Sequence, residues 1–192
     1  MNLETLKNAL PDYAKDLKLN LGTLSNETSL SDQQKWGVFL ATAFAVGEPT
    51  TVRAINGEVQ GKLSPEAQRA AKAAAAIMGM NNVYYRFTHL VHNETYRTTP
   101  AKLRMTVIGA PGIEKADFEL YSMAVSAVNG CGMCMDAHEA ELRKAGFTTE
   151  QIQASVRIGA VVNAVSRTLA AETALVVANA TTATPAAEAA AA

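Results

Sequence analysis

The chain has 192 residues, of which 48% are hydrophobic and 6% are aromatic, and its formal net charge at neutral pH is −1. This length fits one domain, or two small similar halves that share a core. The even spread of charge excludes a basic stripe for nucleic acid and an acidic tail. Alanine is in excess, and because it is the best helix former and a poor strand former, the composition favours packed helices.

The first residues, 1–5, lack a basic stretch followed by an apolar core, so we expect no signal peptide. We also expect no membrane span, since the apolar stretch 38–46 is too short to cross a bilayer. The expected location is therefore cytoplasmic. Disulfides of cytoplasmic proteins are usually catalytic or transient rather than structural.

The first part of the chain shows helical periodicity interrupted by turn residues. Gly22 is expected to end the second helix, Ser31 is a suitable N-cap for the third, and Ser64-Pro65 is a typical start for the fifth. Gly79 is expected to interrupt or kink the alanine-rich stretch that follows. Helices are predicted, in chain order, over the ranges 3–10, 12–21, 32–47, 50–59, 65–78 and 81–93.

The second part begins with a loop over 95–100 and a segment of undecided type over 102–107. Gly130 and Gly146 mark helix ends, and Thr148 is an N-cap candidate. Helices are predicted over 115–128, 131–144 and 149–177. The remaining stretch, 178–192, is a low-complexity alanine and threonine tail that we expect to be disordered.

The two parts resemble each other at an offset of 82 to 84 residues, with pseudo-repeats over about 31–93 and about 113–177. Each reads as a helix, a tight glycine turn, a shorter helix and a capped long helix. The predicted fold class is therefore all-α, a single helical domain over 1–177 built from two similar halves by internal duplication. Where the second half has its two cysteines, the first has Glu48-Pro49-Thr50-Thr51, so only the second half carries thiol chemistry.

Both cysteines lie in the stretch Gly130-Cys131-Gly132-Met133-Cys134-Met135-Asp136-Ala137-His138. Cys131 and Cys134 face one side of a helix, and His138 lies one turn beyond Cys134. A vicinal thiol pair beside a base is typical of redox chemistry. The helix N-terminus lowers the pKa of the Cys131 thiol, whereas His138 can take the proton of Cys134. These residues alone leave open which sulfur reacts first.

A carboxylate could orient His138 and hold its proton. Glu119 is a candidate because it lies on the preceding helix and the turn at 129–130 folds the two helices together. Glu114, Glu139 and Glu141 are rivals, although the last two point to other faces of the helix that carries the cysteines.

Three other interpretations remain. A CxxC motif with a histidine and a carboxylate can bind a metal, but a single CxxC would need distant ligands, so we expect none. The cysteines could also be buried packing residues. His89 and His92 share a helix face near Glu94, and a solvated or core pair is favoured there over a metal site.

Glu119, Cys131-Gly132-Met133-Cys134 and His138 follow the spacing E-x(11)-C-x-x-C-x(3)-H. With the opening Leu10-Pro11-Asp12-Tyr13-Ala14-Lys15-Asp16 and the duplicated layout, the chain resembles the alkyl hydroperoxidase D (AhpD) family. That family belongs to the wider carboxymuconolactone decarboxylase-like group of all-helical proteins. The resemblance covers nearly the whole chain, to about residue 178.

The resemblance implies an antioxidant dithiol oxidoreductase, a peroxidase that reduces organic hydroperoxides. It also implies re-reduction of a partner peroxiredoxin, alkyl hydroperoxide reductase C. Electrons would come from dihydrolipoamide on a lipoylated 2-oxoacid dehydrogenase component, an external reductant, with no bound cofactor. The resemblance further implies a homo-oligomer, a trimer or a multiple of one. The alternative is a redox-inactive carboxymuconolactone decarboxylase-like binding protein or decarboxylase.

The resemblance also assigns roles by position. Cys134 would be the peroxidatic thiol that becomes a sulfenic acid, and it could form an interchain disulfide with the partner. Cys131 would be the resolving thiol and proton donor, closing an intramolecular redox disulfide. His138 and Glu119 would form the relay that activates Cys134. Met133 departs from the pattern, because several members have a histidine there, and a relay through that imidazole is not available in this chain.

Overall fold

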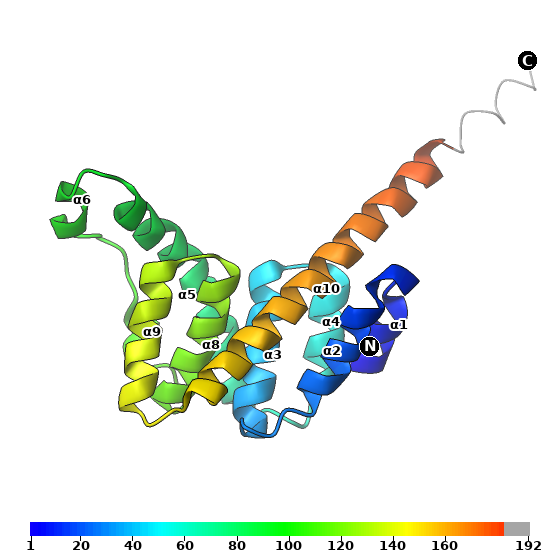
Figure 1. The fold of residues 1–192 in the computed structure, drawn as a ribbon, viewed down its shortest axis with the longest axis horizontal. Helices are drawn as coiled ribbons and strands as arrows, with labels where there is room; N and C mark the ends of the chain where they lie inside the picture. Colours follow the sequence, from blue (N-terminus) through cyan, green and yellow to red (C-terminus); the bar gives the residue numbers. More distant parts are fainter. Residues whose placement is uncertain (183–192) are drawn as a thin grey trace, which may run out of the picture.

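The computed structural model describes residues 1–182, which form ten α-helices, one 3-10 helix and no strand (Figure 1). The predicted all-α class is therefore confirmed. The elements are α1 (Leu3–Ala9), η1 (Asp12–Ala14), α2 (Lys15–Ser25), α3 (Asp32–Val46), α4 (Pro49–Glu58), α5 (Pro65–Leu90), α6 (Thr95–Thr98), α7 (Thr106–Gly109), α8 (Lys115–Val128), α9 (Gly132–Lys144) and α10 (Thr149–Thr182).

The predicted N-caps of α3, α5 and α10 are confirmed. The Ser31 hydroxyl accepts the backbone N–H of Gln34 at 3.2 Å, and the Gln34 side chain accepts the N–H of Ser31 at 3.0 Å. Ser64 and Thr148 each accept the N–H three residues further on, at 3.1 and 3.2 Å. Each bond satisfies a donor that the first turn leaves unpaired, so local sequence sets these helix starts.

Three expectations about helix ends and loops were wrong. Gly22 lies inside α2, and Gly79 lies inside an uninterrupted α5. A helical glycine costs about 1 kcal/mol relative to alanine, which tertiary packing of the rest of the helix outweighs. The expected loop over 95–100 contains the short helix α6.

The last helix also runs past its expected end near 177 and reaches Thr182. The rest of the expected disordered tail, 183–192, lies outside the described residues.

The helices α3 and α8 pack against each other, and each of them also packs against α5 and α10, so these four helices enclose the core. The helix α9 packs on α8 and α5, and α4 lies beside α3, so α4 and α9 occupy different sides of the bundle (Figure 1). Gly37 lets α3 approach α8 closely, since a Cβ there would lie 2.1 Å from the ring of Tyr121. The Tyr121 hydroxyl donates to the carbonyl of Gln33 at 2.9 Å, which fixes this crossing.

The helix α10 crosses the bundle and extends beyond it (Figure 1). The segment Thr149–Ala178 holds an 18-residue window with mean hydropathy 1.3, enough by length and composition for a membrane span. The expectation that no such stretch exists was therefore wrong. One such helix is weak evidence for a membrane span, since the core helix of a soluble protein passes the same test. Of this window 22% is buried inside the protein, and α10 contributes Ile158, Val162 and Val165 to the core.

The order of helices repeats along the chain, since α3, α4 and α5 are followed later by α8, α9 and α10. A glycine with positive φ lies between the first two helices of each set, Gly47 at 78° and Gly130 at 69°. This order agrees with two similar halves. The internal duplication and the domain limits 1–177 stay predictions.

Candidate active site

The turn between α8 and α9 places both cysteines at the start of α9. Gly130 has the positive φ that glycine adopts without steric cost, and the N–H of Cys131 donates to the carbonyl of Ser126 at 3.1 Å. Cys131 is the N-cap residue of α9, and Cys134 lies in its first turn. Both sulfurs therefore lie near the unpaired N–H groups and the positive end of the helix dipole.

A disulfide joins Cys131 to Cys134, so the structure represents the oxidised form of the pair. The two residues differ in access. Cys131 is 0% exposed, whereas Cys134 is 7% exposed and lines a cavity. A molecule that enters this cavity meets Cys134 first.

Glu119 and His138 form a buried pair between α8 and α9. The Nδ1 atom of His138 lies 2.7 Å from Oε2 of Glu119, and both side chains are buried. A carboxylate at Nδ1 fixes the orientation and the tautomer of the imidazole. Since His138 stands one turn beyond Cys134 on α9, its other nitrogen is the one available to a group in the cavity.

The rival carboxylates lie elsewhere. Glu114 is exposed at the start of α8. Glu139 pairs with Arg143 at 2.7 Å, and Glu141 pairs with Lys144 at 2.6 Å. The structure thus brings Glu119, and none of these three, against His138.

The cavity beside Cys134 has a volume of about 200 Å³ and is mostly apolar. One wall comes from α9, the opposite wall from α5, and α7 contributes one residue. Met133, which departs from the family pattern, is part of the α9 wall. The lining residues are Met78, Asn81, Tyr85, Ile108, Met133, Cys134, Ala137 and His138.

Sequence reasoning missed the α5 wall. The available signal was the pair Asn81-Asn82, two buried amides within an alanine-rich helix. Asn82 donates to Ser126 Oγ and accepts from the Asn129 side chain, both at 2.9 Å. These bonds tie α5 to the end of α8, directly before the cysteine turn.

Within residues 1–182, no group of three or more histidine, cysteine or acidic side chains is arranged to hold a metal ion. His89, His92 and Glu94 lie exposed around the end of α5. Nothing in their placement favours the metal interpretation over a solvated pair.

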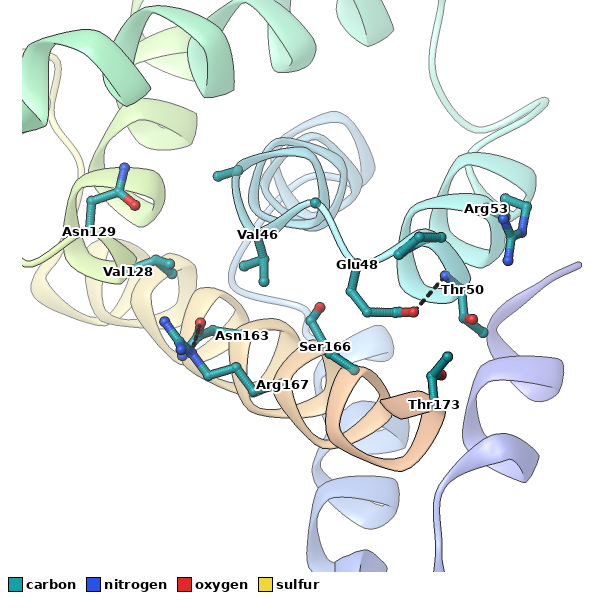
Figure 2. A pocket seen from close by; sticks show the side chains of 14 residues that line it. Val46, Glu48, Thr50, Arg53, Val128, Asn129, Asn163, Ser166, Arg167 and Thr173 are labelled. Carbon is teal, nitrogen blue, oxygen red and sulfur yellow. Dashed lines mark hydrogen bonds between the residues drawn. The ribbon is translucent and has the colours of Figure 1, made fainter. Parts of the chain in front are cut away.

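A larger cavity, about 630 Å³, lies between the α3–α4 turn and α10 (Figure 2). None of the cysteines, His138 or Glu119 lines it. Its buried carboxylate, Glu48, already accepts the N–H groups of Thr50 at 2.9 Å and Thr51 at 2.6 Å. Glu48 also accepts the Thr51 hydroxyl at 2.8 Å, so this carboxylate serves the start of α4.

Residues 94–177 match the model of the carboxymuconolactone decarboxylase family. The chain is 71% identical to alkyl hydroperoxide reductase AhpD of Hyphomonas neptunium, over 91% of this chain and 97% of the relative. It is 65% identical to the protein of that name from Maricaulis maris, over 90% and 99%. The corresponding protein of Streptomyces coelicolor is 57% identical, over 91% and 98%.

Proposed function

Because the chain belongs to the AhpD family, within the carboxymuconolactone decarboxylase-like superfamily, we propose that it is an antioxidant dithiol oxidoreductase that reduces alkyl hydroperoxides. One observation carries the proposal. Cys134 and His138 share the wall of one apolar cavity, and Glu119 holds the far side of the His138 ring at 2.7 Å. This arrangement joins a thiol, a base and an orienting carboxylate in that order.

The first step consumes the peroxide. In the reduced protein His138 takes the proton of the Cys134 thiol, and Glu119 stabilises the resulting imidazolium. The Cys134 thiolate attacks the terminal oxygen of the hydroperoxide, so an S–O bond forms while the O–O bond breaks. The alkoxide leaves and takes a proton from His138. The products are an alcohol and a Cys134 sulfenic acid.

The second step protects Cys134 from further oxidation. The Cys131 sulfur attacks the sulfenic sulfur, and the hydroxyl group leaves as water with the proton of the Cys131 thiol. The product is the Cys131–Cys134 disulfide, the bond that the structure contains. Cys131 needs no access to the cavity for this step, in agreement with its complete burial.

The remaining roles concern the partners. We assign reduction of the disulfide to dihydrolipoamide of a lipoylated 2-oxoacid dehydrogenase component. We assign re-reduction of an alkyl hydroperoxide reductase C peroxiredoxin to an interchain disulfide at Cys134, which is the more exposed of the two cysteines. Exposed Phe87, Leu90 and Tyr96 near the end of α5 support a homo-oligomer, a trimer or a multiple of one, in the cytoplasm.

The test is peroxide consumption by the reduced protein. Cys134→Ser removes the nucleophile, so the rate with cumene hydroperoxide should fall about a thousandfold or more, to the background. Intact-mass measurement after one equivalent of peroxide should show a loss of about 2 Da in the wild type, from disulfide formation. Cys131→Ser should instead gain about 16 Da as a sulfenic acid.

Full peroxide consumption by Cys134→Ser would show that another group is the nucleophile. An unchanged wild-type mass would support the alternative, a redox-inactive carboxymuconolactone decarboxylase-like binding protein or decarboxylase.

A further inference from the structure

Two neighbouring asparagines on α5 have different surroundings. Asn81 is 5% exposed and Asn82 is 1% exposed. The Asn82 amide uses both of its ends, on Ser126 Oγ and on Asn129. The Oδ1 atom of Asn81 is buried and has no hydrogen-bond partner within the described part of the chain. Asn82 therefore has a structural explanation that Asn81 lacks.

A contribution to stability does not explain why position 81 is an asparagine. Asparagine is a poor residue for a helix interior, and a buried acceptor without a partner costs free energy. Leucine, whose side chain has the same branching, is a better helix former and would match the mostly apolar cavity better. Such an unpaired group in a native structure calls for an explanation outside packing.

The position of Asn81 supplies that explanation. Asn81 lines the same cavity as Cys134 and His138, and it lies on the α5 wall while those two lie on the α9 wall. A molecule in this cavity would have the thiol on one side and a carboxamide, with both donor and acceptor groups, on the other.

We propose that Asn81 binds the peroxide group of the substrate, an inference that rests on the proposed function. The hydroperoxide O–H donates to the Asn81 carbonyl oxygen, which gives the buried acceptor its partner. The amide N–H of Asn81 donates to the oxygen that carries the alkyl group. That oxygen gains negative charge as the O–O bond breaks, so this bond strengthens in the transition state. Asn81 itself is unchanged by the reaction.

The same cavity defines the class of substrate. Met78, Tyr85 and Ile108 give it apolar walls for a small alkyl or aryl group. The Asn81 oxygen requires a donor, which a hydroperoxide has and a dialkyl peroxide lacks. The site therefore takes organic hydroperoxides with a free O–H and discriminates against dialkyl peroxides.

The test uses Asn81→Leu in the full-length reduced protein, because leucine keeps the branching of the side chain and removes both hydrogen-bonding groups. The second-order rate constant with cumene hydroperoxide should fall about tenfold. Alkylation of Cys134 by iodoacetamide, which needs no peroxide contact, should keep its wild-type rate. The melting temperature should stay the same or rise, because an unpaired buried acceptor is removed.

Asn82→Ala is the matched control. It breaks the bonds to Ser126 and Asn129, so it should lower the melting temperature and leave the peroxide rate of the folded protein unchanged. If Asn81→Leu does not fold, Asn81→Ala serves in its place and should show the same tenfold loss.

If the wild type reduces peroxide and the Asn81 variant does so at the same rate, the inference about Asn81 is wrong and the proposed function still stands. An equal slowing of peroxide reduction and alkylation would also overturn the inference, because Asn81 would then act on the thiol. A wild type that consumes no peroxide would overturn the proposed function, and the inference with it.

Discussion

The two hairpins of the molecule, α3–α4 and α8–α9, have the same backbone plan and differ in the residue that starts the second helix. In each, a glycine with positive φ precedes an N-cap residue with extended backbone. The N-cap of α4 is Glu48, whose carboxylate accepts three hydrogen bonds from Thr50 and Thr51. The N-cap of α9 is Cys131, whose side chain makes no capping bond.

The difference shows how one helix terminus can serve stability or reactivity. Burial raises the pKa of the Glu48 carboxyl, whereas hydrogen bonds from Thr50 and Thr51 lower it. Together these hydrogen bonds outweigh burial, so the pKa lies below its usual value. The same kind of terminus, left without a carboxylate at α9, acts on the thiols Cys131 and Cys134. The first hairpin thus uses the N–H groups for its own stability, and the second leaves them for sulfur chemistry.

The two hairpins also differ at the positions of Glu119 and His138. When Gly130 is aligned with Gly47, Glu119 corresponds to Trp36 and His138 to Ile55. Trp36 and Ile55 are buried in the core, whereas Glu119 and His138 form a buried polar pair. A buried polar pair without function would be a poor substitute for packed apolar side chains.

Among the variants that compare the two hairpins, the largest effect is expected from breaking this pair. Glu119→Gln keeps the size of the side chain but removes the charge that faces His138 in the proposed proton transfer. The second-order rate constant for cumene hydroperoxide should fall about a hundredfold, within the usual range for general acid–base catalysis. Stopped-flow mixing of the reduced variant with peroxide measures it.

Glu139→Gln is the control, because Glu139 is next to His138 in sequence and pairs with Arg143 at the surface. Its rate should stay within about twofold of the wild type. Equal losses in the two variants would mean that general negative charge near α9, and not the contact with His138, supports the reaction.

The second expected effect concerns the first hairpin. Glu48→Ala removes three hydrogen bonds at the start of α4, so the free energy of unfolding should fall by about 1–2 kcal/mol. The peroxide rate should not change, because Glu48 does not line the cavity of Cys134. Urea unfolding and the peroxide assay on the same sample test both parts.

Glu66 lies in the first turn of α5 and is exposed, so Glu66→Ala should change the free energy of unfolding by less than about 0.5 kcal/mol. A similar loss in both variants would show that charge near any helix start, and not the Glu48 bonds, accounts for the effect.

Helix periodicity and capping residues predicted most of the fold, because both are local in sequence. Ser31 and Ser64 start their helices where expected, for example. Gly79 was misjudged because local propensity favoured a break, while the packing of residues on both sides keeps α5 continuous. That packing depends on helices from other parts of the chain.

The same distinction, between features that are local in sequence and features that depend on packing, applies to the site. The relation of Cys134 to His138 follows from helix geometry, and the tight turn makes Glu119 a reasonable partner. Asn81 could not be found in this way, because it reaches the cavity only through the packing of α5 against α9. The cavity itself is a tertiary feature, so its substrate-facing side needed the structure.

The smallest expected effect is the pH dependence of the Glu48 contribution. The pKa of Glu48 is lowered in the folded protein, so its contribution to stability is fully present above the unfolded value of about 4.3. It is lost as the pH falls through the folded pKa. Glu48→Gln keeps one acceptor but has no charge. The free energy of unfolding of the variant should therefore be about 1 kcal/mol lower than that of the wild type at pH 7.

That difference should stay constant from about pH 6 to 8 and shrink below about pH 4, because the protonated carboxyl then resembles the amide. Urea titrations of both proteins across this range measure it, and subtracting one from the other cancels the other acidic groups. A difference that persists undiminished at low pH would show that Glu48 acts through shape and not charge. The N–H groups of α4 would then not select a carboxylate, and the contrast with the thiols at α9 would lose its electrostatic basis.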